Sequence, residues 1–518
     1  MLLFGLLNAS SLPPAVAATI GSGKCVQTVD SITGVSVVES GAFCYVAFKS
    51  GTRVWTSPVG VVSIDLLVVG GGGGGASRHA GGGGAGGLLQ STGVGINGSD
   101  LTITVGAGGA GGAAQSTAGS NASNGTNSSV SGGGITTLNA VGGGGGSSNT
   151  TAGSGGSGGG GNCCASTAGT GTLGQGNSGS NGVTDNSTYW VGGGGGGAGG
   201  AGTNSVPTKA GSGGTGVAIS WISTSIGTTL AVGAVVSSQL FFAGGGGGGS
   251  DRNSIPGGDG GNGGGAPGST GLATATNGTV NTGGGGGASG ISGVGTGSLK
   301  GGDGGSGVVV IRYLMPVFNN SATSSIAENT STSTNAATVV VSESSTITIR
   351  PVLDSSFFTV VFVDSVTARI RFISSPDFEA RADSGGNNEY DLTIRATMLS
   401  GNYSESSLKI TVTDVIETAV LGAPSLSGAP SKGRSVTITV TSDTPGKLRF
   451  FFAGKKIPNC LARATSGSYP NYSATCSWVP MTSGSLPIYA TLTPTDVMLS
   501  AVTSASTIKF VLRRTGLR

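Results

Sequence analysis

Runs of consecutive glycines fill the middle of this 518-residue chain. The stretch from Gly70 to Gly307 holds 88 of the 106 glycines, whereas an average globular protein contains about 7% glycine. Short β-branched or apolar segments lie between the runs, for example Leu101-Thr-Ile-Thr-Val105 and Val308-Val-Val-Ile-Arg312, and these are typical of strands. Because a flexible glycine-serine tether has no use for strands, the pattern predicts a folded domain.

Polyglycine has one regular way to pack. In the extended left-handed polyproline II helix it has three residues per turn, and every N–H and C=O points outward. Each glycine costs about 0.5–1 kcal/mol more backbone entropy than alanine, so packed helices need dense hydrogen bonding between them. Collagen is excluded, because the stretch has no Gly-x-y period and its only prolines are Pro207, Pro256 and Pro267. A disordered low-complexity tract is the alternative that composition leaves open.

The N-terminal segment indicates export. An apolar run over residues 1–7 precedes Ala15-Val-Ala17, a small-x-small cleavage pattern, so we expect a signal peptide over residues 1–17. No later run reaches eighteen apolar residues, and we expect no transmembrane segment and a secreted or cell-surface location. The net charge is only +3, and the scattered Lys and Arg form no cluster of five or six, which predicts no nucleic-acid partner.

The six cysteines form three local pairs. In an exported chain, Cys25–Cys44 and Cys460–Cys476 are predicted disulfides, each worth about 3 kcal/mol by loop entropy. Cys163 and Cys164 are adjacent, and they are either free, bridged to each other or paired with another chain. Metal ligation by cysteine is disfavoured, because the chain has no CxxC spacing and His79 is its only histidine.

Residues 18–69 have the pattern of a β-rich segment. The alternation in Ala42–Phe48 predicts two faces, with Phe43, Tyr45 and Ala47 on one and Cys44, Val46 and Phe48 on the other. Two apolar segments frame the glycine-rich stretch: Val61–Val69 runs into Gly70, and Val308–Tyr313 follows Gly307. We expect these two strands to lie close in space.

Ordered motifs over residues 22–315 carry a family resemblance. They are Ile64-Asp-Leu-Leu-Val-Val69 before six glycines, Ala85-Gly-Gly-Leu-Leu89, Leu101-Thr-Ile-Thr-Val-Gly106 and Gly304-Gly-Ser-Gly-Val-Val-Val-Ile-Arg-Tyr313. This set resembles the glycine-rich domain of large secreted bacterial repeat proteins. Related domains occur in phage tail-tip adhesins and in certain animal receptor kinases. The resemblance implies polyglycine II helices packed between β-elements.

The composition changes abruptly after Tyr313. The last 211 residues contain 11 glycines but 32 of the 47 charged residues. Strand-like segments of alternating polarity recur from Ala337 to Thr413, and a second set runs from Ser435 to Leu512. Both sets are typical of antiparallel β-sandwiches. The predicted organisation is therefore all-β: a signal peptide (1–17), a β lead-in with the glycine-rich domain (18–315), and two β-sandwiches (316–420 and 421–518).

Three acidic motifs in the first predicted sandwich resemble those of cadherin-like repeats. They are Ala327-Glu328-Asn329, Pro376-Asp377-Phe378-Glu379 and Thr413-Asp414-Val415-Ile416-Glu417. In that family such acids bind calcium, so the resemblance assigns Glu328, Asp377, Glu379 and Asp414 as candidate calcium ligands. The sequence departs from the family pattern at two positions, with Thr397 in place of Asp and Ile416 in place of Asn. The alternative to a calcium site is that the four acids are ordinary solvated carboxylates on the surface of the sandwich. Residues 421–518 resemble bacterial immunoglobulin-like repeats.

Motifs for catalysis are weak. The G-x-S-x-G pattern at Gly155–Gly159 lies inside glycine runs without a strand-to-helix context. The G-x-G-x-x-G matches lack the Gly-Lys-Ser/Thr of a P-loop. We therefore expect no enzyme. A secreted glycoside hydrolase stays as an alternative, because its two carboxylates need no fixed spacing in sequence.

The features together predict a secreted or cell-surface structural and adhesion protein with cadherin-like calcium binding. The expected partner is a cell-surface protein or glycan, or a second copy of the chain. An alternative is a glycan-binding adhesin head carried on the two sandwiches. Four aromatic residues are candidates for stacking on sugars, although core positions are favoured for them: Trp55, Tyr189, Trp190 and Trp221.

Overall fold

The computed structural model describes residues 18–21, 23–115, 119–164, 167–186, 188–251, 254–271, 273–290, 299–415, 418–468, 470–495 and 499–511. The predicted signal peptide lies outside these residues. The chain forms two compact units, and the second comprises residues 325–332, 374–389 and 411–518. Each sheet draws its strands from only one of the ranges 18–315, 316–420 and 421–518. None of the helices in the described ranges has the length and apolar character needed to cross a bilayer.

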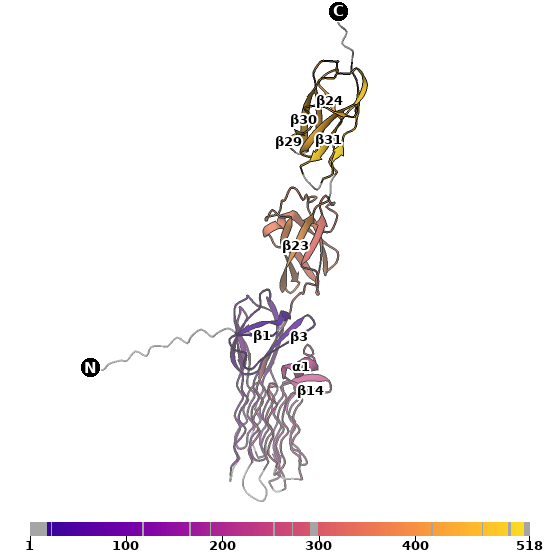
Figure 1. Cartoon of the computed structure of the whole chain (residues 1–518). Helices are drawn as coiled ribbons and strands as arrows, with labels where there is room; N and C mark the ends of the chain where they lie inside the picture. Colours follow the sequence, from indigo (N-terminus) through magenta and orange to yellow (C-terminus); the bar gives the residue numbers. More distant parts are fainter. Residues whose placement is uncertain are drawn as a thin grey trace, which may run out of the picture. The chain divides into compact units, whose positions relative to one another are not determined.

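A five-stranded sheet joins the two ends of the glycine-rich stretch (Figure 1). Its strands run in the order β3 (Val35–Ser40), β4 (Phe43–Phe48), β16 (Val308–Leu314), β6 (Ser63–Val69) and β7 (Leu88–Gly95). Strand β16 is antiparallel to both neighbours and places Val308 opposite Val69. The expectation that the two framing strands lie together is confirmed, and they are hydrogen-bonded to each other.

A second, six-stranded sheet covers one face of the first. Its order is β1 (Ala18–Ile20), β2 (Gln27–Val29), β5 (Gly51–Thr56), β8 (Leu101–Val105), β9 (Ser128–Gly132) and β10 (Leu138–Ala140). The core between the sheets contains Cys44, Val46 and Phe48 together with Trp55 of β5. Because side chains alternate along a strand, Tyr45 and Ala47 belong to a different core on the opposite face, as predicted.

A small insertion covers that opposite face. It consists of β13 (Val217–Ala218), α1 (Thr224–Leu230), β14 (Ala234–Val236) and β15 (Gln239–Phe242). The Ser223 side chain caps α1 by accepting a hydrogen bond from the Ile226 N–H, and Ala231 ends the helix in a left-handed conformation. The sequence did not predict this helix, because seven residues are too few for a helical period to show.

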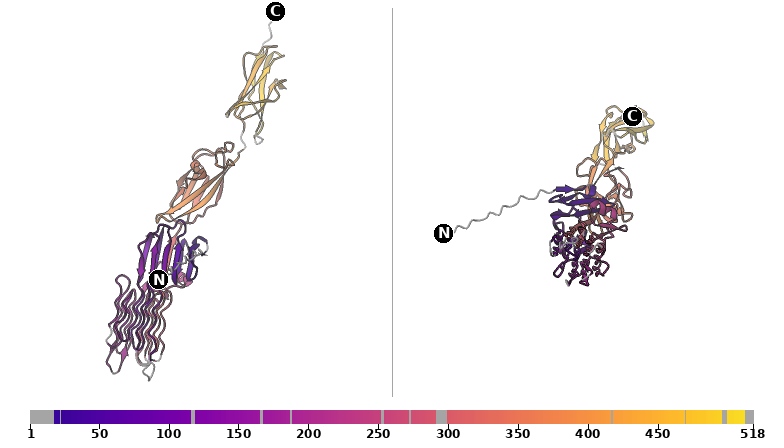
Figure 2. Two further views of the ribbon diagram at one scale, coloured as in Figure 1. Left: turned by 90° about the vertical axis from the view of Figure 1, so that its left-hand side faces the viewer. Right: turned by 90° about the horizontal axis from the view of Figure 1, so that it is seen from below.

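The glycine runs form an ordered lattice of extended chains (Figure 2, left). Residues 70–77 donate backbone hydrogen bonds with a period of three. Gly71, Gly74 and Ser77 donate to the carbonyls of Thr126, Ser123 and Ser120 in turn, and Gly72 and Gly75 donate to those of Gly305 and Gly302. Gly70, Gly73 and Ala76 donate to the carbonyls of Gly87, Gly84 and Gly81. Each set of donors therefore faces one antiparallel neighbour. Three residues per turn is the repeat of polyglycine II, and the packed-polyglycine prediction is confirmed.

At Gly73 the lattice has no room for a side chain. A Cβ atom built on Gly73 would lie 2.1 Å from the carbonyl oxygen of Gly144. That oxygen is backbone of a neighbouring chain, and it accepts a hydrogen bond from the Gly84 N–H at 2.8 Å. Close approach, and not conformational freedom, is therefore what requires glycine here.

The first sandwich follows the predicted strands. One sheet has the order β17 (Thr323–Ala327), β23 (Tyr403–Thr413), β22 (Glu389–Met398) and β19 (Ser345–Ile349), and the other has the order β18 (Ala337–Val340), β21 (Thr367–Phe372) and β20 (Phe358–Phe362). The rings of Phe358, Phe372 and Tyr390 contact one another in its core, with ring centroids 4.3–5.5 Å apart. The short 3-10 helix η2 (Leu353–Phe357) precedes β20.

The C-terminal sandwich also has two sheets. One has the order β24 (Ser425–Leu426), β25 (Val436–Ser442), β30 (Asn471–Trp478) and β29 (Ser466–Ser468). The other contains β27 (Lys455–Lys456), β26 (Gly446–Phe452), β31 (Gly484–Pro494) and β32 (Val502–Thr503), with β28 (Arg463–Ala464) on β26 and β33 (Thr507–Val511) on β31. Both sandwiches agree with the predicted all-β fold class.

Both predicted disulfides are present. Cys25 pairs with Cys44 and Cys460 pairs with Cys476, with Cα atoms 5.4 and 5.7 Å apart, and all four side chains are buried. Cys163 and Cys164 are bridged to each other. The structure thus selects one of the three states that the sequence left open for this pair.

The lattice makes a direct prediction. Gly73→Ala should lower the free energy of unfolding by about 3 kcal/mol or more, because the new methyl group overlaps the Gly144 carbonyl. Urea denaturation of the full chain measures this effect. Gly95→Ala is the matched control, because a Cβ at Gly95 in β7 meets nothing within 4 Å. Equal stability of the two variants would contradict a close-packed lattice.

Candidate functional site

Three of the four predicted calcium ligands form one cluster in the second unit. A carboxylate oxygen from each of Glu328, Glu379 and Asp414 lies within 4.8 Å of the others. Glu328 directly follows β17, Asp414 directly follows β23, and Glu379 lies in the segment between β21 and β22. Three motifs separated by up to 86 residues therefore meet at one end of the sandwich.

Glu328 is the fixed member of the cluster. Its side chain is 3% exposed, and its two carboxylate oxygens accept hydrogen bonds from the backbone N–H groups of Phe378 and Val415, at 2.9 and 2.8 Å. Its own backbone N–H donates to the Thr413 carbonyl at 3.0 Å. These bonds tie the three acidic motifs together and give both oxygens of the buried side chain hydrogen-bond partners.

Glu379 is the member whose ionisation is most perturbed. Loss of hydration, the charge and hydrogen bond of Glu328, and the charge of Asp377 raise the pKa of Glu379 to about 7. Because the Glu379 side chain is exposed, the neighbouring carboxylates are the stronger physical cause. A cation placed among them would remove this repulsion.

Asp377 has a different position from the other three. Its Oδ1 atom accepts hydrogen bonds from the N–H groups of Glu379 and Ala380, both at 3.0 Å. It therefore caps the turn that presents Glu379, and it lies outside the group of three. Of the two departures from the family pattern, Thr397 pairs with Thr346 between β22 and β19, whereas Ile416 lies outside the described residues.

A loop that the sequence interpretation missed supports the cluster. Burial alone would raise the pKa of Asp383, but the backbone N–H groups of Asn387 and Asn388 donate to its carboxylate and hold the pKa below its usual value. The Asn388 side chain then donates to the Phe378 carbonyl at 2.8 Å. The turn-forming run Asp383-Ser-Gly-Gly-Asn-Asn388 was the available signal.

A second cluster of ligand atoms lies in the glycine-rich lattice. The Nδ1 atom of His79 is 3.0 Å from the Sγ atom of Cys163, and both belong to a group of three with Cys164. Burial and the Arg78 charge lower the pKa of His79 to about 4, so the imidazole is neutral at neutral pH. Sequence spacing could not reveal this contact, because 84 residues separate the two side chains.

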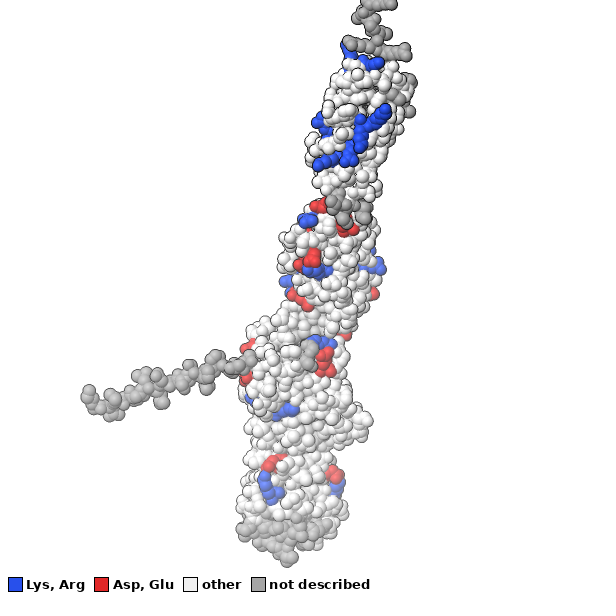
Figure 3. All heavy atoms as spheres, viewed as in Figure 1, with Lys and Arg blue, Asp and Glu red and all other residues white. Residues whose placement is uncertain are grey.

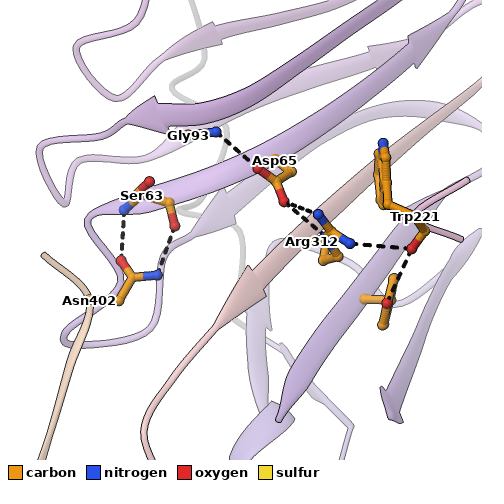
Figure 4. Close-up of polar contacts among 7 residues, drawn as sticks. Ser63, Asp65, Gly93, Trp221, Arg312 and Asn402 are labelled. Carbon is orange, nitrogen blue, oxygen red and sulfur yellow. Dashed lines mark hydrogen bonds and ion pairs between the residues drawn. The ribbon is translucent and has the colours of Figure 1, made fainter. Parts of the chain in front are cut away.

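Arg312 of β16 occupies a central position beneath the insertion (Figure 4). Its Nε and Nη2 atoms donate to Asp65 at 2.8 and 2.6 Å, and Asp65 also accepts from the Gly93 N–H. The guanidinium carbon lies 4.7 Å from the ring centroids of both Phe43 and Trp221. This fully engaged group stabilises the fold.

The four aromatic candidates for sugar stacking occupy different environments. Trp55 is fully buried and donates to Gln27, and Trp221 packs on Arg312, so both are structural. Tyr189 and Trp190, at the start of the short strand β12 (Trp190–Val191), are half-buried. The preference for core positions is confirmed for Trp55, whereas Trp221 is partly buried and packs against a core from its edge.

Asn402 is a buried polar residue that the sequence did not single out. Its Oδ1 atom accepts hydrogen bonds from the N–H groups of Val62 and Ser63, both at 2.8 Å. Its Nδ2 atom donates to the carbonyls of Ser63 and Leu314, both at 2.9 Å. Figure 4 shows the bonds between Asn402 and Ser63. All of these residues belong to the first unit.

The C-terminal sandwich collects positive charge on its surface (Figure 3). Its described residues include seven exposed Lys and Arg side chains and one acid, Asp443. Lys447 and Arg449 alternate with buried residues along β26, and Lys456 lies opposite Phe451. The ring of Phe451 stacks on Tyr489 of β31 at 4.9 Å. Cations that are scattered in sequence thus share a face with an aromatic pair.

Comparison with known proteins identifies the central domain. The sequence model of a family described as a glycine-rich domain matches residues 48–314, slightly more than half of the chain. The chain belongs to this glycine-rich domain family. The matched range contains the lattice, the His79 cluster and the strands of the two sheets from β5 onward. Strands β1–β3 and most of β4 precede it.

Beyond the glycine-rich domain, the comparisons are weak. No curated protein sequence matches significantly. A structure of protocadherin gamma B2 extracellular cadherin domains 3–6 matches at 14% identity and a TM-score of 0.24, covering 38% of this chain and 46% of that one. A structure of the titin domains Z1Z2 in complex with telethonin matches at 17% identity and a TM-score of 0.21. The match covers 39% of this chain and 98% of the titin chain. The chain spans less than half of the protocadherin structure.

The support that Glu328 gives can be tested by truncation. Glu328→Ala should lower the free energy of unfolding by about 2–3 kcal/mol without added calcium, because it removes the acceptor of the Phe378 and Val415 N–H groups. Chemical denaturation in EDTA provides the measurement. Glu343→Gln, in the same sandwich, is the control and should have little effect. A Glu328→Ala variant as stable as the parent would show that these hydrogen bonds contribute nothing.

Proposed function

We propose that this protein is a secreted or cell-surface structural and adhesion protein whose first sandwich binds calcium. The supporting observation is the convergence of Glu328, Glu379 and Asp414 within 4.8 Å. Calcium prefers several oxygen ligands, largely carboxylates, and it would relieve the repulsion that raises the Glu379 pKa. The backbone carbonyls of the three motif segments and water would complete the shell. Asp377 contributes by shaping the turn.

The adhesive role fits the construction of the chain. The glycine-rich lattice is a rigid, nearly uncharged scaffold, and the two sandwiches are of the kind that extracellular proteins use as spacers. Three disulfides are in keeping with an oxidising compartment. We propose a cell-surface protein, a glycan or a second copy of the chain as partner.

Catalysis is the weaker proposal for the same carboxylates. Both oxygens of Glu328 already accept backbone hydrogen bonds, and the side chain is buried. A general acid or base must reach the substrate proton directly or through one water. Glu328 and Glu379 are thus better suited to holding a cation than to cleaving a glycosidic bond.

Calcium binding has a specific signature in one variant. Glu379→Gln should raise the melting temperature of the full chain in EDTA, because it removes the repulsion among the carboxylates, and it should abolish any further rise in millimolar calcium. The parent should gain about 2–3 kcal/mol of stability at calcium concentrations near 100 times Kd. Differential scanning fluorimetry and calorimetric titration measure the two effects.

Glu343→Gln serves as the control and should respond to calcium as the parent does. A parent chain whose melting temperature is the same in EDTA and in calcium, with no heat of binding, would refute the calcium site.

A second candidate function comes from the basic face of the C-terminal sandwich. We propose that it binds acidic polysaccharide. Lys447, Arg449 and Lys456 make no ion pair among the described residues, so their charges are available. The Phe451–Tyr489 pair beside them offers a flat apolar surface to sugar rings, and the threonines Thr491 and Thr493 opposite Arg449 and Lys447 offer hydroxyl groups.

Heparin affinity chromatography of the full chain tests this surface. Arg449→Gln with Lys456→Gln should weaken binding several-fold and lower the salt concentration of elution, since each exposed charge is worth about 0.2–1 kcal/mol. Lys432→Gln with Arg434→Gln removes equal charge from elsewhere on the sandwich and should elute close to the parent. Equal losses in both double variants would show a non-specific charge effect, and tighter binding to single-stranded DNA than to heparin would favour nucleic acid.

A further inference from the structure

The turn that carries His79 is rigidly held. Residues 77–80 reverse the chain between two lattice strands, and the Gly81 N–H donates to the Ser147 carbonyl at 3.0 Å. The strand that leads to Cys163 is bonded to the same neighbours: Gly160 donates to Gly82, and Ser147 donates to Gly160. The distance of 3.0 Å between His79 Nδ1 and Cys163 Sγ is therefore fixed by backbone hydrogen bonds on both sides.

The backbone at this turn is strained. Arg78 and His79 have φ angles of 72° and 40°, in the left-handed region that favours glycine. Such conformations cost about 1–3 kcal/mol each for other residues, and they concentrate at functional sites. The glycine-rich stretch thus keeps two non-glycine residues here at a cost in backbone energy, as it also does at Ser237 and Ser238 between β14 and β15.

The two sulfur atoms differ in access. Cys163 is 4% exposed and contacts His79, whereas Cys164 is exposed. The other two disulfides are at most 1% exposed and lie in the cores of their domains. An external reductant therefore meets the Cys163–Cys164 bond first.

We propose that reduction of the Cys163–Cys164 disulfide opens a binding site for one thiophilic divalent cation, such as Zn²⁺, held by His79 and both cysteines. A small dithiol supplies the two electrons: it becomes a cyclic disulfide, and the chain gains two thiols. On binding, each thiol loses one proton and becomes a thiolate ligand. The His79 Nδ1 lone pair is the third ligand, and water takes the fourth position on the exposed side.

The geometry suits this class of metal. Zinc–sulfur and zinc–nitrogen bonds of about 2.3 and 2.0 Å place tetrahedral ligand atoms about 3.3–3.8 Å apart. The Nδ1 atom of His79 lies 3.0 Å from the Cys163 Sγ atom, and the two Sγ atoms are bonded to each other until reduction. Once the disulfide is reduced, the two sulfur atoms have to separate to about 3.8 Å to accommodate the metal. Thiolate and imidazole select zinc over calcium, which makes this site chemically distinct from the carboxylate cluster.

Cobalt titration of the full chain tests the proposal. The chain is treated briefly with dithiothreitol and freed of it under nitrogen, and peptide mass spectrometry establishes that only Cys163–Cys164 is reduced. The reduced chain should bind one equivalent of Co²⁺ with thiolate charge-transfer and visible d–d absorption, and Zn²⁺ should displace it. The oxidised chain should show neither band.

Two variants probe the ligands. His79→Gly removes the imidazole and relieves the strain of the positive φ, so this variant should fold well. Cys164→Ser leaves the Cys163 thiol as the one sulfur ligand. Both should weaken Co²⁺ binding at least about tenfold. Glu343→Gln lies outside both ligand clusters; it is the control and should bind Co²⁺ as the parent does. The proposal is overturned if the reduced parent binds no Co²⁺, if the oxidised chain binds it equally, or if either ligand variant binds it undiminished.

Discussion

Backbone hydrogen bonding between extended polyglycine chains is the interaction on which the largest domain depends. Residues 70–77 direct successive N–H groups toward three different antiparallel neighbours, and every third residue returns to the same one. A protein built in this way needs no side-chain core over much of its length, because the backbone itself supplies the cohesion. The entropy cost of ordering glycine is offset only while every chain is bonded on all sides.

The β-sheets solve the problem of starting and ending such a lattice. Strand β16 lies between β4 and β6, so the segment that leaves the lattice is paired with the segment that enters it. The apolar cores on the two faces of this sheet provide the stability that polyglycine cannot obtain from hydrophobic burial. Arg312 and Asp65 complete the face beneath the insertion.

Function is expected where this regular scaffold is interrupted. In the lattice the interruption is the His79 turn against Cys163, and in the first sandwich it is the end where three acidic motifs meet. Both sites use the same principle. A dense set of backbone hydrogen bonds holds side chains in an arrangement that they would not adopt in isolation, with charge repulsion at Glu379 and positive φ at His79 as the signs of that constraint.

The sequence by itself determined the fold class, the positions of most strands, the two faces of β4 and the disulfides Cys25–Cys44 and Cys460–Cys476. These follow from local periodicity and short loops, which report directly on secondary structure. It also located Glu328, Glu379 and Asp414 through motif resemblance. The tertiary structure alone decided that Asp377 caps a turn, that His79 contacts Cys163 and that the cations of β26 and β27 share a face. The physical reason is that these contacts depend on which chains lie side by side, and runs of identical glycines carry no local signal of their neighbours.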